Sequence, residues 1–129
     1  METGSLLVCV TRQVSCERLI HRGADLALEE NLNLEVLHVV ANGANLLGNP
    51  SEGEALDFLF TTAKQYNANM SVLRSENIIE SISRFAREHK TRAIVLGESR
   101  QNIKEDDGII WQLRALLPGI QVHVISSPE

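Results

Sequence analysis

The sequence predicts a three-layer α/β/α sandwich built on a five-stranded parallel sheet. Five short apolar stretches alternate with four segments whose apolar residues recur at helical spacing. Two of those stretches, residues 6–10 and 93–96, are continuously apolar, which is typical of strands buried on both faces of a parallel sheet. Such alternation implies right-handed crossovers with helices on both faces. We expect the strand order 3-2-1-4-5, with these two strands adjacent at the centre.

The chain opens with a strand and a long helix. The strand covers residues 6–10, and the helix continues to about Glu30, with Ser15 expected to cap its first turn through a side-chain oxygen. Its apolar face is formed by Leu19, Ile20, Gly23, Ala24 and Ala27. Residues 34–40 then form the second strand, which is apolar except at two positions.

A loop and the second helix follow. Residues 41–50 are rich in Asn and Gly and are interpreted as loop. Ser51 and Glu54 have the spacing of a capping box, which predicts a helix start. One face of this helix carries Ala55, Leu56, Leu59, Phe60, Ala63 and Tyr66. Residues 70–73 form a short third strand.

The last part of the chain contains two helices and two strands. The third helix presents Ile78, Ile79, Ile82, Phe85 and Ala86. The strand at 93–96 ends at Gly97, where the chain can turn at the edge of the sheet that binds ligands in open α/β folds. A fourth helix restarts at Gly108 and carries Ile109, Leu113, Leu116 and Leu117. Pro118 and Gly119 stop it, and the last strand runs from Ile120 to Ile125.

Length and charge restrict the class of protein. The 129 residues are expected to form a single domain over residues 1–129, with residues 1–5 disordered or derived from a tag. The formal net charge of −5 argues against nucleic acid or an anionic membrane as a partner. No apolar run approaches the roughly 18 residues of a membrane span, and the chain does not open with the basic residues of a signal peptide. We expect a cytoplasmic protein.

The cysteines and strand histidines are expected to be structural. Cys9 lies within a central strand. Cys16 is near a helix N-terminus, which can lower a thiol pKa, but it shares the helical stripe of Leu19 and is interpreted as core. His38 and His123 have no His or Cys at metal-ligand spacing beside them. We therefore predict no metal site and no catalytic residue, and we keep His38, near the ligand end of its strand, as a candidate for a polar role in a pocket.

Four stretches carry a resemblance to a known family: Leu7-Val-Cys-Val10, Glu17-Arg-Leu-Ile20, Phe85-Ala-Arg-Glu-His89 and Ala93-Ile-Val-Leu-Gly97. Together with the alternating pattern, they resemble the universal stress proteins (the UspA-like family) over nearly the whole chain. The variant that the chain is most similar to is the stress-protein domain inside potassium-sensing histidine kinases. The resemblance implies the sandwich predicted above, in the Rossmann-like form also found in adenine nucleotide alpha hydrolases.

The nucleotide-binding motif of that family is degenerate in this chain. Members of the ATP-binding branch have an Asp at the end of strand one. They also have a Gly-x-x-Gly, nine further residues, and Gly-Ser or Gly-Thr opening the last helix. Here Thr11 stands at the Asp position and Gly97 matches the first glycine, but the second glycine falls on Arg100. The closing pair falls on Ile110-Trp111, or on Gly108-Ile109 if the loop is two residues shorter.

These departures weaken the implied phosphate site. The glycines let the backbone approach phosphates, and the hydroxyl after the last one donates to them, which an isoleucine cannot do. The Cβ of Arg100 obstructs the approach, although its charge could itself hold a phosphate. Glu105, Asp106 and Asp107 place three carboxylates at the N-terminus of the last helix, where they suit the helix dipole but repel a polyanion unless a metal intervenes. AMP or a cyclic nucleotide is therefore favoured over ATP.

The expected nucleotide site lies at the ends of strands one, two and four. Backbone groups near Val10 and Val39 would contact the adenine, and Arg12 could meet an anion across the crevice from Arg100. The expected binding residues are Val10, Thr11, Arg12, Val39, Gly97, Ser99, Arg100 and Gly108.

Three function classes stay open. The first is a stress-response or signalling module that binds a nucleotide or a protein partner without catalysis, and it fits the resemblance best. An ATP-binding or ATP-hydrolysing stress protein would need a phosphate loop, and the chain has no Gly-x-x-x-x-Gly-Lys-Ser/Thr. The third class is a purely structural dimerisation domain. In each case we expect a homodimer through the last strand, because its alternating pattern suits a sheet edge and stress-protein relatives often pair this edge across a two-fold axis.

Overall fold

Five parallel strands form one sheet in the order β3-β2-β1-β4-β5, as the sequence predicts. The computed structural model describes residues 4–97 and 103–125, with the side chains of residues 103–108 left out. The strands are β1 (Ser5–Cys9), β2 (Asn33–Val40), β3 (Asn69–Arg74), β4 (Thr91–Gly97) and β5 (Gln121–Ile125). The helices are α1 (Gln13–Glu30), α2 (Glu52–Gln65), α3 (Ile78–Glu88) and α4 (Ile103–Leu116), and a short 3-10 turn, η1 (Leu46–Gly48), lies between β2 and α2.

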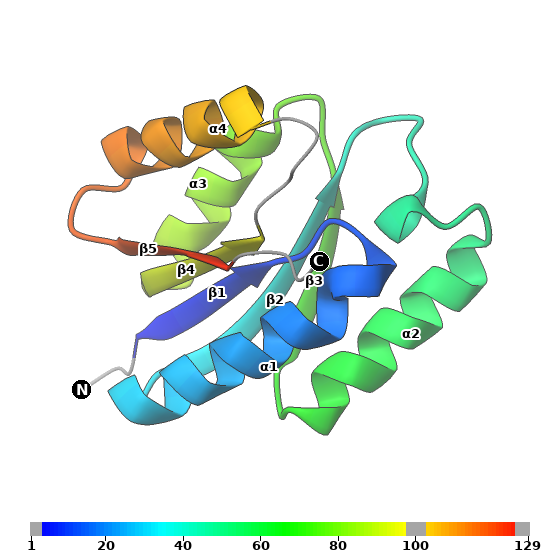
Figure 1. The fold of residues 1–129 in the computed structure, drawn as a ribbon, viewed down its shortest axis with the longest axis horizontal. Helices are drawn as coiled ribbons and strands as arrows, with labels where there is room; N and C mark the ends of the chain where they lie inside the picture. Colours follow the sequence, from blue (N-terminus) through cyan, green and yellow to red (C-terminus); the bar gives the residue numbers. More distant parts are fainter. Residues whose placement is uncertain (1–3, 98–102, 126–129) are drawn as a thin grey trace.

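The helices cover the two faces of the sheet in pairs. Helices α1 and α2 lie on one face and α3 and α4 on the other (Figure 1). Every residue of β1 is buried, as expected for the central strand of a sheet covered on both sides. Side chains that alternate along β1 therefore enter different cores: Leu6 and Val8 pack with α1 and α2, whereas Leu7 and Cys9 pack with α3 and α4.

A glycine sets the distance between α1 and the sheet. A Cβ at Gly23 would lie 2.3 Å from Cγ2 of Val8, closer than real Cβ atoms approach another heavy atom. The absence of a side chain therefore lets α1 lie directly against β1. The sequence places Gly23 correctly on the buried face of this helix, and the structure shows why a larger residue would not fit.

Side-chain hydrogen bonds connect neighbouring strands near their amino ends. The Ser5 hydroxyl lies 3.0 Å from that of Thr91 and donates to the carbonyl of His89 at 2.9 Å, which ties β1 to the start of β4. The Asn69 amide donates to the carboxylate of Glu35 at 2.9 Å, which ties β3 to β2. These bonds satisfy polar groups that burial would otherwise leave without partners.

Two predicted helix starts need correction, and the predicted start of α2 is confirmed without its capping box. Helix α1 begins at Gln13 with Arg12 at the N-cap, and Ser15 donates to the carbonyl of Arg12 at 3.3 Å instead of capping the helix. Ser51 is the N-cap of α2 but makes no side-chain cap, so the capping box is not formed. Helix α4 begins at Ile103, five residues before the predicted start at Gly108. The prediction missed this first part because its residues are mostly polar and show no apolar periodicity. None of the helices in the described residues is long and apolar enough to cross a membrane.

Candidate functional site

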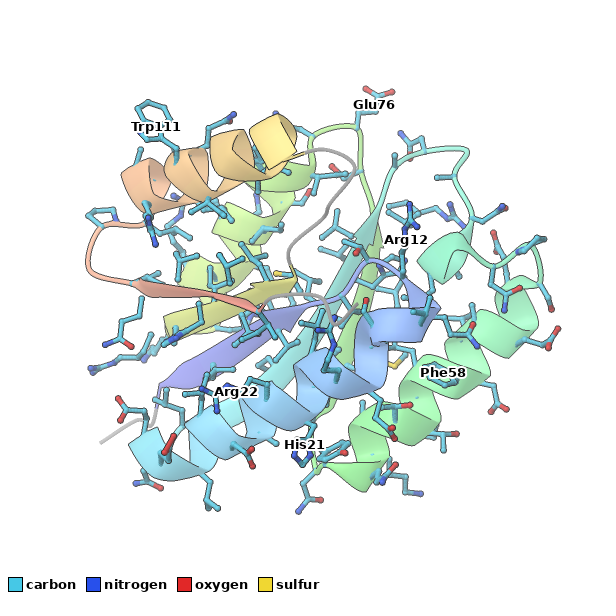
Figure 2. All side chains as sticks on the ribbon, in the orientation of Figure 1. Arg12, His21, Arg22, Phe58, Glu76 and Trp111 are labelled. Carbon is cyan, nitrogen blue, oxygen red and sulfur yellow. The ribbon has the colours of Figure 1, made fainter. Side chains whose placement is uncertain are left out.

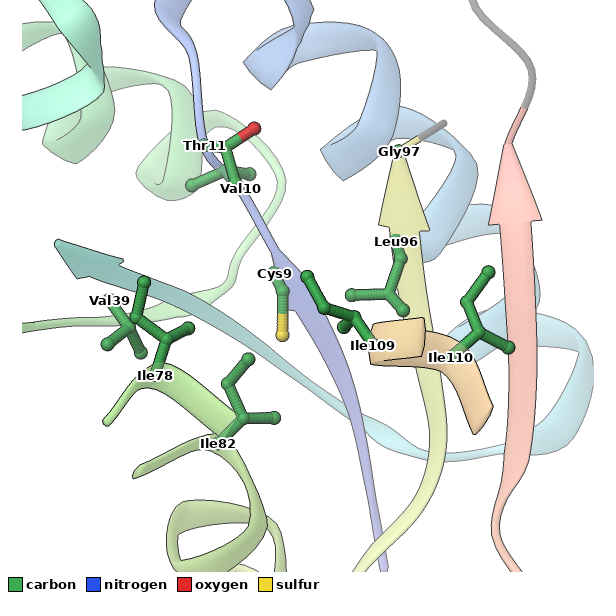
Figure 3. Close-up of a pocket in the computed structure, with 10 residues that line it drawn as sticks. All are labelled: Cys9, Val10, Thr11, Val39, Ile78, Ile82, Leu96, Gly97, Ile109 and Ile110. Carbon is green, nitrogen blue, oxygen red and sulfur yellow. The ribbon is translucent and has the colours of Figure 1, made fainter. Parts of the chain in front are cut away.

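A pocket of about 100 Å³ opens at the carboxyl ends of the central strands. Its walls come from the ends of β1, β2 and β4 and from the first turns of α3 and the middle of α4 (Figure 3). It is lined by Cys9, Val10, Thr11, Val39, Ile78, Ile82, Leu96, Gly97, Ile109 and Ile110. This is the edge of the sheet at which open α/β folds bind ligands. Here β1 and β4 are neighbours, and the helices that follow them, α1 and α4, lie on opposite faces of the sheet.

The lining is apolar and uncharged. None of the ten described lining residues carries a charge, and Thr11 is the only hydroxyl among them. Figure 3 shows the Thr11 hydroxyl pointing away from the isoleucines, so the inner wall is made of hydrocarbon. Such a wall favours a flat apolar ring and provides no side-chain partner for a phosphate.

Four of the expected binding residues meet at this pocket. Val10, Thr11, Val39 and Gly97 all line it, although 87 residues of sequence separate Val10 from Gly97, because parallel pairing brings the strand ends together. Gly97 also packs closely against α1. It is the last residue of β4, and a Cβ there would lie 3.2 Å from Cδ1 of Leu19, so the structure explains the glycine by close packing against α1.

The other expected residues lie elsewhere or outside the description. Arg12 is the N-cap of α1 at the corner after β1 (Figure 2); it is exposed and is absent from the pocket lining. Gly108 lies inside α4, directly before Ile109, and does not open the helix. Ser99 and Arg100 fall outside the described residues, so the expected phosphate loop stays a prediction.

The sequence analysis did not predict the isoleucines that form the helix side of the pocket wall. The sequence analysis expected Ile78, Ile82 and Ile109 as core residues and Ile110 as a degenerate motif position. Ile82 is a buried core residue and Ile109 packs against the same core, as expected, but all four isoleucines also line the pocket. Ile78 is 38% exposed, which is unusual for a core residue. Helical periodicity identifies a face turned toward the sheet, but it does not distinguish a filled core from a cavity at its end.

Both cysteines are buried, as predicted. Cys16 is fully buried in the core under α1, and burial raises its pKa to about 12. Cys9 lines the pocket, and burial raises its pKa to about 12 as well. A thiol with such a pKa is protonated at neutral pH and is a poor nucleophile. The described residues contain no group of three or more His, Cys, Asp or Glu side chains that could hold a metal ion.

His38 does not line the pocket but is bonded to it. The residue is 3% exposed, and its Nδ1 lies 2.8 Å from the carbonyl oxygen of Val10, a pocket residue. The polar role that the sequence suggested is therefore indirect: His38 holds the end of β1 from the α1/α2 side of the sheet.

Comparisons with solved structures agree on the fold. A universal stress protein of Archaeoglobus fulgidus in complex with dAMP has a TM-score of 0.65 at 18% identity, covering 97% of this chain and 99% of that one. A universal stress protein in complex with cAMP has a TM-score of 0.66 at 14% identity, with 97% of each chain covered. The fold is that of the universal stress proteins. A class III photolyase of Agrobacterium tumefaciens matches with a TM-score of 0.72 at 15% identity over 26% of its length, so the fold alone does not assign a function.

The sequence comparison matches the chain to part of a sensor protein. The chain is 28% identical over 127 residues to a KdpD sensor protein of Synechocystis, covering 95% of this chain. This match confirms the predicted similarity to the stress-protein domain of potassium-sensing histidine kinases. The chain spans about a third of that relative's length, 33%. No family model matches the chain.

Proposed function

We propose that this chain is a stress-protein-like module that binds an adenine nucleotide and acts in stress response or signalling without catalysing a reaction. The observation that supports this most directly is the uncharged, hydrocarbon-lined pocket at the carboxyl ends of β1, β2 and β4. Two proteins of the same fold were crystallised with dAMP and with cAMP, each of which carries an adenine and a single phosphate. A cytoplasmic location stays a prediction.

The size of the pocket favours burial of the base alone. Sites that enclose a whole drug-sized ligand occupy about 300–1,000 Å³, and this pocket measures about 100 Å³. A nucleotide would therefore insert its adenine between the isoleucines of α3 and α4, with the ribose at the strand ends beside Thr11. The phosphate would lie outside the hydrocarbon wall.

The charge of the chain favours few phosphates. Glu105, Asp106 and Asp107 lie in the first part of α4, two to four residues before the pocket residue Ile109. Like charges repel, so each further phosphate adds an unfavourable interaction unless a divalent cation intervenes. We therefore propose AMP or a cyclic nucleotide in preference to ATP, and keep an ATP-binding or ATP-hydrolysing protein as the alternative.

We also propose that the module forms a homodimer through β5 and passes its signal to a protein partner. Strand β5 pairs with β4 on one side and lies at the edge of the sheet, with residues 122–125 half-buried. An edge strand carries unpaired N–H and C=O groups that pairing with a second copy would satisfy. The similarity to a KdpD sensor protein supports a signalling role. If the chain binds no nucleotide, the alternative is a purely structural dimerisation domain.

Thermal melting with a set of nucleotides tests the proposal. With about 1 mM ligand, a dissociation constant of about 1 µM would raise the free energy of unfolding by about 4 kcal/mol, and the melting temperature with it. We expect AMP and cAMP to raise the melting temperature more than ATP with magnesium, and GMP to raise it least, because the pocket would select the base.

Two results would contradict this proposal. A larger rise with ATP and magnesium than with AMP would favour the ATP-binding alternative and assign the carboxylates of α4 to the metal. No rise with any nucleotide would favour the structural or partner-binding classes. Light scattering on the same samples measures the dimer, and a monomer at micromolar concentration would contradict the role given to β5.

A further inference from the structure

His38 is a buried side chain whose two ring nitrogens both bond the backbone. Its Nδ1 lies 2.8 Å from the carbonyl oxygen of Val10, and its Nε2 lies 2.9 Å from the backbone nitrogen of Leu47. A carbonyl only accepts hydrogen bonds and a backbone N–H only donates them, so the two contacts determine the tautomer. The ring is neutral, with its proton on Nδ1 and a free electron pair on Nε2 that accepts the Leu47 N–H.

The two backbone partners belong to different parts of the chain. Val10 follows β1 and lines the pocket, whereas Leu47 lies in η1, within the loop that connects β2 to α2. Leu47 has φ of 55° and ψ of 21°, a left-handed conformation that is uncommon for a leucine and persists only where contacts hold it. Its side chain and that of Leu46 are buried in the core under α1 and α2.

A second bond attaches the same loop to the same corner. The Asn49 side-chain amide donates to the Gln13 side-chain carbonyl at 3.0 Å, which ties the residue after η1 to the first residue of α1. Thr11 and Arg12 lie between Val10 and Gln13 along the chain. The segment that carries the pocket residue Thr11 is therefore held to η1 on both sides.

Protonation would remove one of these links. An imidazolium carries a hydrogen on both nitrogens, so its Nε2–H would face the Leu47 N–H, donor against donor. The neutral ring would become a buried cation beside a strained turn. The bond to Val10 would survive, because Nδ1 still donates, and the bond that holds η1 would be lost.

The charged groups around His38 offer the cation no compensation. Arg74 on β3 acts on the ring with a like charge, and its guanidinium is bonded to Glu52 on α2 at 2.6 Å and to the Ala44 carbonyl at 3.1 Å. Cys16 on α1, in the core cluster on this face of the sheet, is a neutral thiol. Among the described residues, no carboxylate is bonded to His38.

We propose that His38 is a proton-sensitive latch that joins η1 to the β1 end of the pocket, and that mild acid releases η1 and weakens ligand binding. The second part rests on the proposed nucleotide function, whereas the first concerns the chain alone. His38 is a positioning residue in this account, because it acts on the pocket through Val10 and the attached loop. The expected ligand effect is a fall in affinity for AMP as the pH decreases.

The pH range follows from the environment of the ring. Burial lowers the pKa of His38 below its ordinary value of 6.5, the bond to the Val10 carbonyl raises it, and the charge of Arg74 lowers it, with a net decrease. The unfolded chain therefore takes up the proton before the folded chain does. The stabilisation that the neutral ring provides is complete above about pH 6.5 and is lost as the pH falls through the lower pKa of the folded state.

Nuclear magnetic resonance of the wild-type protein tests the latch without a ligand. We expect 15N imidazole spectra at pH 7.5 to show the Nδ1–H tautomer of His38. We expect the hydrogen-exchange protection of the Leu47 amide to fall at least tenfold between pH 7.5 and the pH at which His38 is protonated, relative to the amide of Val36. The opposite tautomer, a Leu47 amide that stays equally protected once His38 is charged, or a His38 that never titrates before the protein unfolds would overturn the proposal.

A variant separates the proton from the packing. His38→Gln keeps a side-chain acceptor for Leu47 and cannot titrate near neutrality, so Leu47 protection should no longer depend on pH. His21→Gln, at an exposed position of α1, is the matched control and should keep the wild-type profile, because the bonds of His21 reach only Tyr66 and Asp25 within the described residues. If His38→Gln retains the pH dependence, the latch is not His38.

Titration calorimetry with AMP tests the coupling to the pocket. Affinity should be constant from pH 8 to 6.5 and decrease at least threefold on protonation of His38 in the wild type and in His21→Gln, but not in His38→Gln. If the Leu47 amide loses protection but the AMP affinity does not change, the latch stands and only its effect on ligand binding is overturned. Absence of AMP binding at every pH would overturn the proposed function, while the exchange data would still decide the latch.

Discussion

The two faces of the sheet differ in how closely their helices pack at the carboxyl ends of the strands. On the α1/α2 face, Gly23 brings the helix against Val8, and hydrogen bonds join His38 to the backbone on either side of it. On the α3/α4 face, the strand ends and the helices leave a pocket of about 100 Å³ lined by isoleucines. The closely packed α1/α2 face positions the strand ends, and the α3/α4 face leaves space between these strand ends and its helices.

The difference shows how a sheet can be stable and still bind a ligand. Buried side chains on the α1/α2 face extend from Leu6 at the amino end to Leu46 and Leu47 beyond the carboxyl end. Those on the α3/α4 face stop at the pocket, where Cys9 and Val39 belong both to the core and to the pocket lining. Substitutions on the first face should therefore act mainly on stability, and those around the pocket mainly on binding.

The largest effect is expected from Gly23→Ala. The added Cβ would overlap Cγ2 of Val8, a short and stiff side chain that is fully buried, so helix and strand would have to separate. Overpacking of this kind destabilises proteins by about 1–3 kcal/mol. Gly53→Ala is the control, because Gly53 also lies in a helix and a Cβ there meets nothing within 4 Å.

Chemical denaturation measures both glycine variants. The control should be neutral or up to about 1 kcal/mol more stable, since alanine favours helix more than glycine does. Equal stability of the two variants would contradict the close packing of α1 on the sheet and with it the contrast between the faces.

A smaller effect on stability and a larger one on binding are expected from Ile109→Trp. The larger side chain would occupy the pocket from its α4 wall, so AMP should bind at least tenfold more weakly, equivalent to about 1.4 kcal/mol. Gln112→Trp adds the same side chain to an exposed position of the same helix and should bind AMP like the wild type. Titration calorimetry measures the AMP affinity of both variants. An unchanged affinity of Ile109→Trp would mean that the nucleotide binds outside this pocket.

Most of the fold could be predicted from the sequence, because it depends on long apolar runs. The strands at residues 6–10 and 93–96 are continuously apolar, which identified them as the central pair, and β1 and β4 are indeed adjacent. The start of α4 at Ile103 could not be found in this way, since polar residues mark neither face of a helix. The turn η1 was missed although Leu46 and Leu47 stand out in a polar loop, because a single turn has no periodicity.

The candidate site was predicted only where it belongs to the strand ends. Val10, Thr11, Val39 and Gly97 follow apolar runs, and parallel topology brings such ends together. Ile78 and the other isoleucines have the same pattern as core residues, so their role became visible only with the pocket. The two bonds of His38 likewise depend on backbone groups at Val10 and Leu47, whose positions no side-chain pattern reveals.

Nuclear Overhauser effects between AMP and the isoleucine methyl groups test the central claim most directly. With isoleucine δ1 methyls labelled, we expect contacts from the adenine H2 and H8 protons to Ile78, Ile82 and Ile109 of the pocket. Ile20 is fully buried on the α1/α2 face and should show no contact. AMP that binds without contacting any pocket isoleucine would contradict the account of this site.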